Sequence, residues 1–440
     1  MSIRCAPTQD RNQKTPTTDA TRQNFSIAKA KIKLEKPCRS NLPTDTSYER
    51  IGELHRRLGD DALAFQYHER SLDIRKNLVV SFPEDAEKLH NLSISLNKVG
   101  DLHCKKGDVS TAIECYTRSL AIAKELASLD PEDTQWQESL SVSYVKLGDI
   151  HRFDDASTAL RYYEKDLEIT QNLVELASEN AFWQSELALS HERLGDVHSK
   201  LGGDTAAMQN HEQSREIRQN LVELAPSNMD WQLNLSVSLE RLGVLHSFDN
   251  QTVGIDFLER ALAIRKKLVA QDRNNVEWQN GLQNSYDKLG SAYEKFGDIS
   301  TALRYFNVEL EVAECLADLS PDNPHLQRNL SFSYQKIGKL HHSLRDGIIA
   351  YQYYEYSLEI HKGLAEADPD DSKRQSDLWY AHFELAKLAN EYSDRDAHRY
   401  HLCKTLQLMS GLFERGMLSP LDQVMLKVVS NMVSKLDPPC

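Results

Sequence analysis

Hydrophobic and polar positions along the chain recur with a long, nearly constant period. A glycine preceded by an apolar residue marks each copy, at Gly52, Gly100, Gly148, Gly195, Gly243, Gly290 and Gly338. The steps between these glycines are 48, 48, 47, 48, 47 and 48 residues, and a weaker eighth copy places Ala386 another 48 residues on. Self-similarity at a fixed period is the sequence signature of stacked repeat proteins.

Other columns keep the same step as the glycine. A small residue follows it by 11 or 12 positions, and an apolar and a leucine column follow later at helical rather than strand spacing. The small residues are Ala64, Ala112, Ala159, Ala207, Gly254, Ala302, Ala350 and Ala397. A glycine inside a helix costs about 1 kcal/mol relative to alanine. We therefore expect the two helices of a copy to touch there, with the glycine facing the small residue.

Two turns divide each copy into a pair of helices. The first turn places a helix-ending glycine before a helix-starting aspartate in Gly59-Asp60, Gly107-Asp108 and Gly297-Asp298. The second turn carries a helix-stopping proline at Pro83, Pro131, Pro226, Pro321 and Pro369. The two 47-residue steps lack one residue in the first turn, at 153–155 and 248–250, which supports the helix assignment.

This pattern resembles the tetratricopeptide repeat: a glycine after an apolar residue, alanine twelve positions later, and an aromatic residue sixteen later in Tyr116, Phe306 and Tyr354. The resemblance covers about residues 46–412. The phrases WQESLSVSYVKLGD (136–149) and WQSELALSHERLGD (183–196) are similar to bacterial arrays attached to signalling ATPases, although no GxxxxGK[ST] occurs here. The resemblance to the tetratricopeptide repeat implies an all-α, right-handed α-solenoid of about eight helix-turn-helix repeats. Its helices should be longer than the usual period of about 34 residues allows.

The two ends of the chain differ from the repeats. Residues 1–45 carry nine Lys/Arg and four Asp/Glu, a balance of +5, and have no sustained apolar period. We interpret them as a disordered basic arm; a targeting peptide is the alternative, although Asp10 and Asp19 fit it poorly. Residues 412–440 are expected to form a C-terminal capping helix and tail, and a docking helix for a partner is the alternative there.

Charge and cysteine usage narrow the partners. The chain has 52 basic and 66 acidic residues, a net charge of −14, which argues against general nucleic-acid binding. No apolar run approaches the roughly 18 residues of a membrane span. Seven scattered cysteines without a Cys-x-x-Cys pair favour free thiols and a cytoplasmic location. No catalytic motif such as GxSxG or HExxH occurs, so we expect neither an enzyme nor a cofactor; the oligomeric state stays open.

A basic column two positions before the glycine is the main candidate for partner binding. Its members are Arg50, Lys98, Lys146, Arg193, Arg241, Lys288 and Lys336. In similar arrays this part of the first helix lines the concave groove, where a positive stripe would attract acidic peptide segments. The alternative is local pairing with an acid three residues later on the same helix. That acid is absent after Arg241, Lys288 and Lys336, so these bases are expected to be unpaired.

Two aromatic columns and one exception complete the candidates. Histidines three positions after the glycine are His55, His103, His151, His198, His246 and His341, with Tyr293 in the sixth copy. Packing is the favoured interpretation, because equivalent helices lie about 10 Å apart, too far for one column to close a zinc site. Trp136, Trp183, Trp231 and Trp278 are expected to pack between repeats, or to form a binding platform. Arg215 interrupts a leucine column and should be paired or point outward.

The sequence thus predicts a scaffold or adaptor that binds a peptide or helical segment of a partner protein. The alternative is a regulatory sensor that responds to a signal or to nucleic acid and switches a partner.

Overall fold

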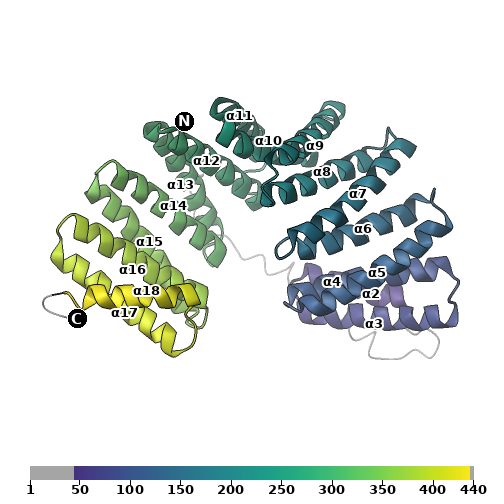
Figure 1. Ribbon diagram of the computed structural model, residues 1–440, viewed down its shortest axis with the longest axis horizontal. Helices are drawn as coiled ribbons and strands as arrows, with labels where there is room; N and C mark the ends of the chain where they lie inside the picture. Colours follow the sequence, from purple (N-terminus) through teal and green to yellow (C-terminus); the bar gives the residue numbers. More distant parts are fainter. Residues whose placement is uncertain (1–43, 437–440) are drawn as a thin grey trace, which may run out of the picture. The chain divides into compact units, whose positions relative to one another are not determined.

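The computed structural model describes residues 44–436, apart from the side chains of Phe248 and Asp249. Within that range the chain consists of seventeen α-helices, and sixteen of them form helix-turn-helix pairs (Figure 1). It divides at Pro226 into two compact units, whose described parts are residues 44–226 and 227–436. Apart from Thr44 and Asp45, the basic arm predicted for residues 1–45 lies outside the described residues.

The N-terminal unit contains four helix pairs, which we number repeats 1 to 4. They are α2 (Asp45–Arg57) with α3 (Asp61–Ser81), α4 (Ala86–Lys105) with α5 (Val109–Leu129), α6 (Thr134–His151) with α7 (Ala156–Leu176), and α8 (Ala181–Lys200) with α9 (Asp204–Leu224). Inside the unit, the second helix of each repeat packs on the first helix of the next. Helices α3 and α5 have 21 residues and α4 has 20. The long repeat period therefore arises from long helices, as predicted.

The C-terminal unit contains repeats 5 to 8 and a final helix. These are α10 (Met229–Asp249) with α11 (Gln251–Gln271), α12 (Val276–Phe296) with α13 (Ile299–Leu319), α14 (Pro324–Ser343) with α15 (Gly347–Ala367), α16 (Ser372–Glu391) with α17 (Arg395–Glu414), and α18 (Pro420–Val433). The same stacking of second helix on next first helix holds within this unit. Eight pairs and a terminal helix confirm the predicted all-α helix-turn-helix array.

The turn chemistry read from the sequence is also confirmed. Gly59, Gly107 and Gly297 have φ of +76°, +82° and +83°, a backbone conformation that side chains disfavour. The aspartate that follows each one caps the next helix; the Asp60 carboxylate accepts from the backbone N–H of Leu63 at 3.1 Å. Such an N-cap stabilises a helix by about 1 kcal/mol. The turns therefore set where each helix starts and ends.

The glycine column does mark the contact between the two helices of a repeat. The expected small neighbour lies beside it in repeats 5 and 7, where the carbonyl oxygens of Gly254 and Ala350 would be 3.0 and 3.3 Å from an added Cβ, but not in repeats 2 and 3. A Cβ placed on Gly148 would lie 2.4 Å from the ring of Tyr163, and one on Gly100 would lie 2.5 Å from the ring of Tyr116. The glycine thus faces the large residue of the second helix rather than the alanine. Ala112 and Ala159 are fully buried nearby. The absence of a side chain makes room for a ring, because overpacking this interface would strain it.

The C-terminal cap is shorter than predicted. Helix α17 continues to Glu414, and α18 starts only at Pro420, after the N-cap Ser419; residues 412–419 are therefore not part of it. Val429 and Val433 of α18 pack in one buried cluster with Trp379 of repeat 8. This helix covers the last repeat, as a cap should.

The described cysteines fit the expectation of free thiols only in part. Cys104 is an exposed free thiol and Cys115 a buried one. Cys315 and Cys403 are disulfide-bonded, so the expectation is wrong for these two. In residues 44–436, no helix combines the length and apolar character needed to cross a membrane.

Candidate protein-binding site

The basic column joins neighbouring repeats through ion pairs. Lys146 of α6 lies 2.8 Å from Asp101 of α4, and Lys98 of α4 pairs with Glu49 of α2. In the C-terminal unit Lys288 of α12 lies 2.5 Å from Glu240 of α10, and Lys336 of α14 pairs with Asp287 of α12. In each case the acid belongs to the first helix of the preceding repeat. The column therefore contributes to stacking.

These contacts correct two expectations. The local alternative paired each base with an acid of its own helix, whereas the partners of Lys98 and Lys146 lie one repeat earlier. Lys288 and Lys336 were expected to be unpaired, which is wrong, since Glu240 and Asp287 pair with them. Searching for an acid three or four residues away on the same helix cannot find these partners, because each partner lies on another helix.

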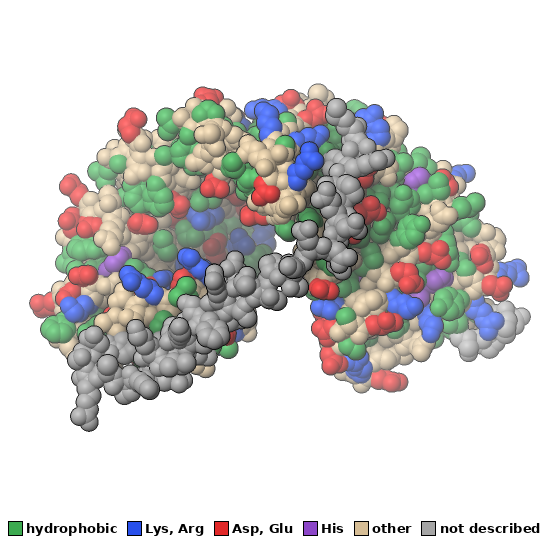
Figure 2. Space-filling view, turned by 180° about the vertical axis from the view of Figure 1, so that it is seen from behind, with side chains coloured by type: hydrophobic (Ala, Val, Ile, Leu, Met, Phe, Trp, Pro, Cys, Tyr) green, Lys and Arg blue, Asp and Glu red, His purple; other side chains and the backbone are tan. Residues whose placement is uncertain are grey.

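The remaining three members of the column lie in different settings. Arg50 is exposed on α2, and Arg241 is exposed on α10. Arg193 of α8 lies 3.7 Å from Asp166, a fully buried carboxylate on α7. Asp166 also accepts from the hydroxyls of Ser141 and Ser190, at 2.5 and 2.7 Å. Burial raises the pKa of Asp166, and these hydrogen bonds and Arg193 oppose the rise. On the face shown in Figure 2, basic and acidic side chains are interspersed.

Four histidines of the column stack on aromatic rings of the second helix of their repeat, in agreement with the packing interpretation, and His103 instead contacts Phe65 of the preceding repeat. His55 stacks on Tyr67 with ring centroids 5.5 Å apart, and His341 stacks on Tyr353 at 5.8 Å. Tyr293 takes the same place in repeat 6 and stacks on Tyr305 at 5.4 Å. His151 and His246 stack in the same way. Within residues 44–436, no group of three or more His, Cys, Asp or Glu side chains is placed to hold a metal ion.

The tryptophans and Arg215 are accounted for by packing and pairing. Trp183 is buried in one cluster with Ile169 and Leu173, and Trp278 packs against the core of repeats 5 and 6. Arg215 is paired rather than isolated, because its guanidinium lies 2.6 Å from Glu212 one turn earlier on α9.

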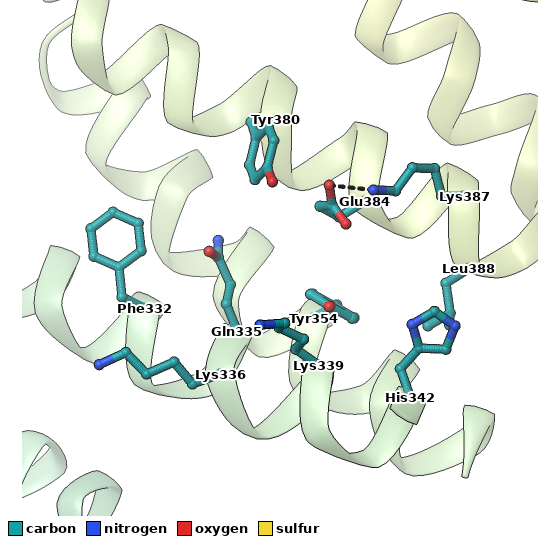
Figure 3. Close-up of a pocket in the computed structure, with 10 residues that line it drawn as sticks. All are labelled: Phe332, Gln335, Lys336, Lys339, His342, Tyr354, Tyr380, Glu384, Lys387 and Leu388. Carbon is teal, nitrogen blue, oxygen red and sulfur yellow. Dashed lines mark hydrogen bonds and ion pairs between the residues drawn. The ribbon is translucent and has the colours of Figure 1, made fainter. Parts of the chain in front are cut away.

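An open pocket of about 610 Å³ lies between the first helices of repeats 7 and 8, and Figure 3 shows its lining. Helix α14 contributes Phe332, Gln335, Lys336, Lys339 and His342, helix α15 contributes Tyr354, and helix α16 contributes Tyr380, Glu384, Lys387 and Leu388. Tyr354 lies at the centre, with residues of α14 on one side and Glu384 on the other. Aromatic surface with a few polar groups is the usual composition of a binding pocket.

Charges of both signs line this pocket. Lys339 is 70% exposed and its ammonium lies 3.3 Å from Glu294, whereas Glu384 is 16% exposed and accepts from Lys387 at 2.7 Å. Burial, followed by the charge of Glu384, raises the pKa of both Tyr354 and Tyr380. Both phenols are therefore neutral hydrogen-bond donors at physiological pH.

Of the predicted column, only Lys336 reaches this pocket. Sequence reasoning missed its other lining residues, although two signals were present. Lys339 stands where repeats 2 and 3 have Asp101 and Asp149, and Glu384 stands at the basic-column position of the eighth copy. Both are departures from the repeat at the same pocket. The regular residues of the basic column take part in stacking, whereas Lys339 and Glu384, which depart from their columns, line the candidate site.

Comparison with known families agrees with this architecture. Two models described as tetratricopeptide repeat match residues 46–84 and residues 95–130, which correspond to repeats 1 and 2. The chain therefore contains tetratricopeptide repeats. This class of repeat protein serves generally in protein–protein interaction. No curated protein matches the sequence.

Three solved structures resemble this chain at low sequence identity. The apo form of RapI is 11% identical, with a TM-score of 0.50 over 78% of this chain and 86% of that chain. BtubC (BKLC) from P. vanneervenii is 21% identical over 57% of this chain and 90% of that one, with a TM-score of 0.45. A thermophilic TPR protein of Thermus thermophilus is 18% identical over 55% of this chain and 98% of that one, with a TM-score of 0.32. The likeness to RapI supports the fold alone.

Proposed function

We propose that this chain is an interaction scaffold that binds a peptide or helical segment of a partner protein in the pocket between α14 and α16. The observation that carries the proposal is the open pocket itself, lined by Phe332, Tyr354 and Tyr380 together with lysines and one glutamate. Tyr380 is 45% exposed. Exposed aromatic surface beside charged groups is typical of the anchoring positions of protein interfaces.

The proposal narrows the role of the basic column. Lys336 stays a partner-binding candidate, now with Lys339 and Lys387 beside it. The inter-repeat ion pairs of Lys98, Lys146 and Lys288 support a stacking role for those three. Arg50, Arg193 and Arg241 lie outside the pocket lining and are secondary candidates. Binding without catalysis or a cofactor is expected.

The proposed location is the cytoplasm. The free thiols of Cys104 and Cys115 support a reducing compartment, and the disulfide-bonded Cys315 and Cys403 argue against it. Fractionation of cells that express the tagged chain distinguishes these locations directly.

Cross-linking in cells, followed by mass spectrometry, tests the binding site. An amine-reactive cross-linker should join a partner to Lys336, Lys339 or Lys387, and the variant Tyr380→Ala should abolish those links. Phe153→Ala is the matched control, because Phe153 is an aromatic side chain that is 70% exposed and lies in the turn before α7. Partner cross-links that map elsewhere and persist in Tyr380→Ala would contradict the proposal.

A further inference from the structure

Repeat 2 shows how three side chains join two successive first helices. The hydroxyl of Tyr116 on α5 donates to the carboxylate of Asp101 on α4 at 2.7 Å. Lys146 of α6 reaches the same carboxylate at 2.8 Å. Helix α4 also contacts α6 directly. The carboxylate therefore satisfies a buried tyrosine and links one repeat to the next.

Repeat 7 has the same three positions with the charges exchanged. Tyr354 corresponds to Tyr116, Lys339 stands at the position of Asp101, and Glu384 stands at the position of Lys146. Lys339 and Glu384 are paired with other residues, Glu294 and Lys387, rather than with each other. Both residues line the pocket, whereas the corresponding positions of repeat 2 are joined by the ion pair of Asp101 with Lys146.

The hydroxyl of Tyr354 is left without an acceptor. Tyr354 is 8% exposed and lines the pocket, and its hydroxyl makes no hydrogen bond to residues 44–436 within the distances that define one. Its ring is also farther from its glycine, because a Cβ on Gly338 would lie 3.4 Å from it, against 2.5 Å between Gly100 and Tyr116. The ring of Tyr354 is buried while its hydroxyl reaches the open pocket, where a ligand can supply the acceptor.

We infer that the pocket recognises a partner segment with one acidic and one basic side chain. This inference rests on the proposed function and specifies its ligand. The ligand carboxylate takes the place that Asp101 has in repeat 2 and accepts from Tyr354 and Lys339. The ligand's basic group pairs with Glu384, whose charge repels a second acid. Phe332 and Tyr380 contact the aliphatic parts of the segment. On a helix, an acid and a base four residues apart present both groups on one face.

Four labelled helical peptides test the ligand chemistry by fluorescence anisotropy with the full chain. They share two leucines and differ only at two positions four residues apart, which hold Glu and Lys, Glu and Glu, Lys and Lys, or Gln and Gln. The Glu/Lys peptide should bind about tenfold more tightly than the other three, as expected when charge-assisted hydrogen bonds are gained. Equal binding of all four, or tightest binding of the Glu/Glu peptide, overturns the inference, as does binding of none.

The double variant Lys339→Asp/Glu384→Lys copies the arrangement of Asp101 and Lys146. It should lose about tenfold in affinity for the Glu/Lys peptide while its thermal unfolding temperature stays equal or rises, so that misfolding does not explain the loss. The matched control Asp101→Lys/Lys146→Glu makes the reverse exchange in repeat 2 and should leave peptide affinity unchanged. Undiminished binding by the first variant overturns the inference. If cellular cross-links to α14 and α16 persist while peptide charge has no effect, the inference fails and the proposed function stands.

Discussion

Repeat 2 in the N-terminal unit and repeat 7 in the C-terminal unit are built from helices of the same lengths and carry a tyrosine at the same position. In repeat 2, Tyr116 donates to Asp101, and Lys146 links that carboxylate to the next repeat. In repeat 7, Tyr354 has no such acceptor and faces a pocket of about 610 Å³. The backbone plan is shared, so the difference arises from the side chains at two charged positions.

The comparison teaches how a repeat array separates stability from recognition. Stability in such arrays is approximately a sum over repeats and their interfaces, so one interface can be relaxed while the others remain tight. The regular interfaces use ion pairs and buried polar contacts, such as Lys146 with Asp101 at 2.8 Å and Arg75 with Ser95 at 2.7 Å. The irregular interface leaves the Tyr354 hydroxyl without an acceptor among residues 44–436, and its two charges pair with Glu294 and Lys387 rather than with each other. Departures from a repeat are therefore where function is expected.

The largest expected difference between the two regions is in how their stability responds to low pH. Burial lowers the pKa of His361, His382 and His401, all in repeats 7 and 8, to about 4. The folded state keeps them neutral, whereas the unfolded chain binds protons below about pH 6.5. Their contribution is complete above about pH 6.5 and is lost as the pH falls toward about 4, by up to about 3 kcal/mol for each histidine.

Urea unfolding at several pH values between about 7 and 4 measures this loss. The double variant His382→Asn/His401→Gln should show a flatter dependence of the unfolding free energy on pH, whatever its stability at neutral pH. The side chains of His382 and His401 are in direct contact, with Nδ1 atoms 2.9 Å apart, so they are removed together. A slope equal to that of the wild type would show that these histidines are not protected in the fold.

Alanine at the repeat glycines is the next largest test. Gly148→Ala should destabilise the protein by about 1–3 kcal/mol, because its Cβ would meet the ring of Tyr163, and Gly148→Leu should be worse. Gly338→Ala should be nearly neutral, since its Cβ has 3.3 Å or more to its neighbours. Gly363→Ala, with no atom within 4 Å, is the control and should stabilise by up to about 1 kcal/mol. Thermal unfolding measures all of them; equal losses at 148 and 338 would remove this structural difference between repeats 3 and 7.

Removing the tyrosine hydroxyl separates the closed from the open arrangement. Tyr163→Phe in repeat 3 deletes a hydrogen bond of 2.6 Å to Asp149 and should cost about 1 kcal/mol. Tyr354→Phe deletes no internal hydrogen bond and should leave the unfolding free energy unchanged. Chemical denaturation measures the unfolding free energy of both variants. A clear loss of stability in Tyr354→Phe would mean that the Tyr354 hydroxyl already has a partner in the fold.

The lysines of the basic column give the smallest effects. Lys146→Met and Lys336→Met each remove a partly exposed ion pair and should cost at most about 1 kcal/mol. They should differ in partner binding, which Lys336→Met weakens and Lys146→Met leaves intact, as measured by cross-link yield in cells. If Lys146→Met reduces that yield as much as Lys336→Met, the column acts as one binding stripe, as the sequence first indicated.

Much of the fold was predictable because its determinants are local. The glycine before Asp60 and the proline at 131 act on their own turns, and the period of the apolar columns reports helix pairing directly. The packing role of His341 was predictable too, since a single column cannot assemble a metal site. The start of α18 was misjudged, because apolar spacing continues through 412–419 while the chain there turns at Gly416, whose φ is +68°.

The site was only partly predictable, because its contacts join helices that are one repeat apart. Lys336 was a candidate, but its pairing with Asp287 spans 49 residues, and helix periodicity contains no information on which repeat supplies a partner. The buried carboxylate Asp166 and its serines were not foreseen, since a lone acid in a helix reads as solvent-exposed. The absence of an acid three residues after Lys336 was noted, but not that Lys339 stands there close to Tyr354.

By itself the sequence determined the repeat, its eight copies, the turns between the paired helices and the class of protein, because turns and helical periodicity depend on residues close along the chain. Only the tertiary structure decided which bases are tied to a neighbouring repeat and which line a pocket. That decision depends on distances of a few ångströms between side chains about 48 residues apart, where a hydrogen bond or ion pair either forms or does not. The charges at 339 and 384 are visible in the sequence, and their place on opposite sides of Tyr354 is visible only in the fold.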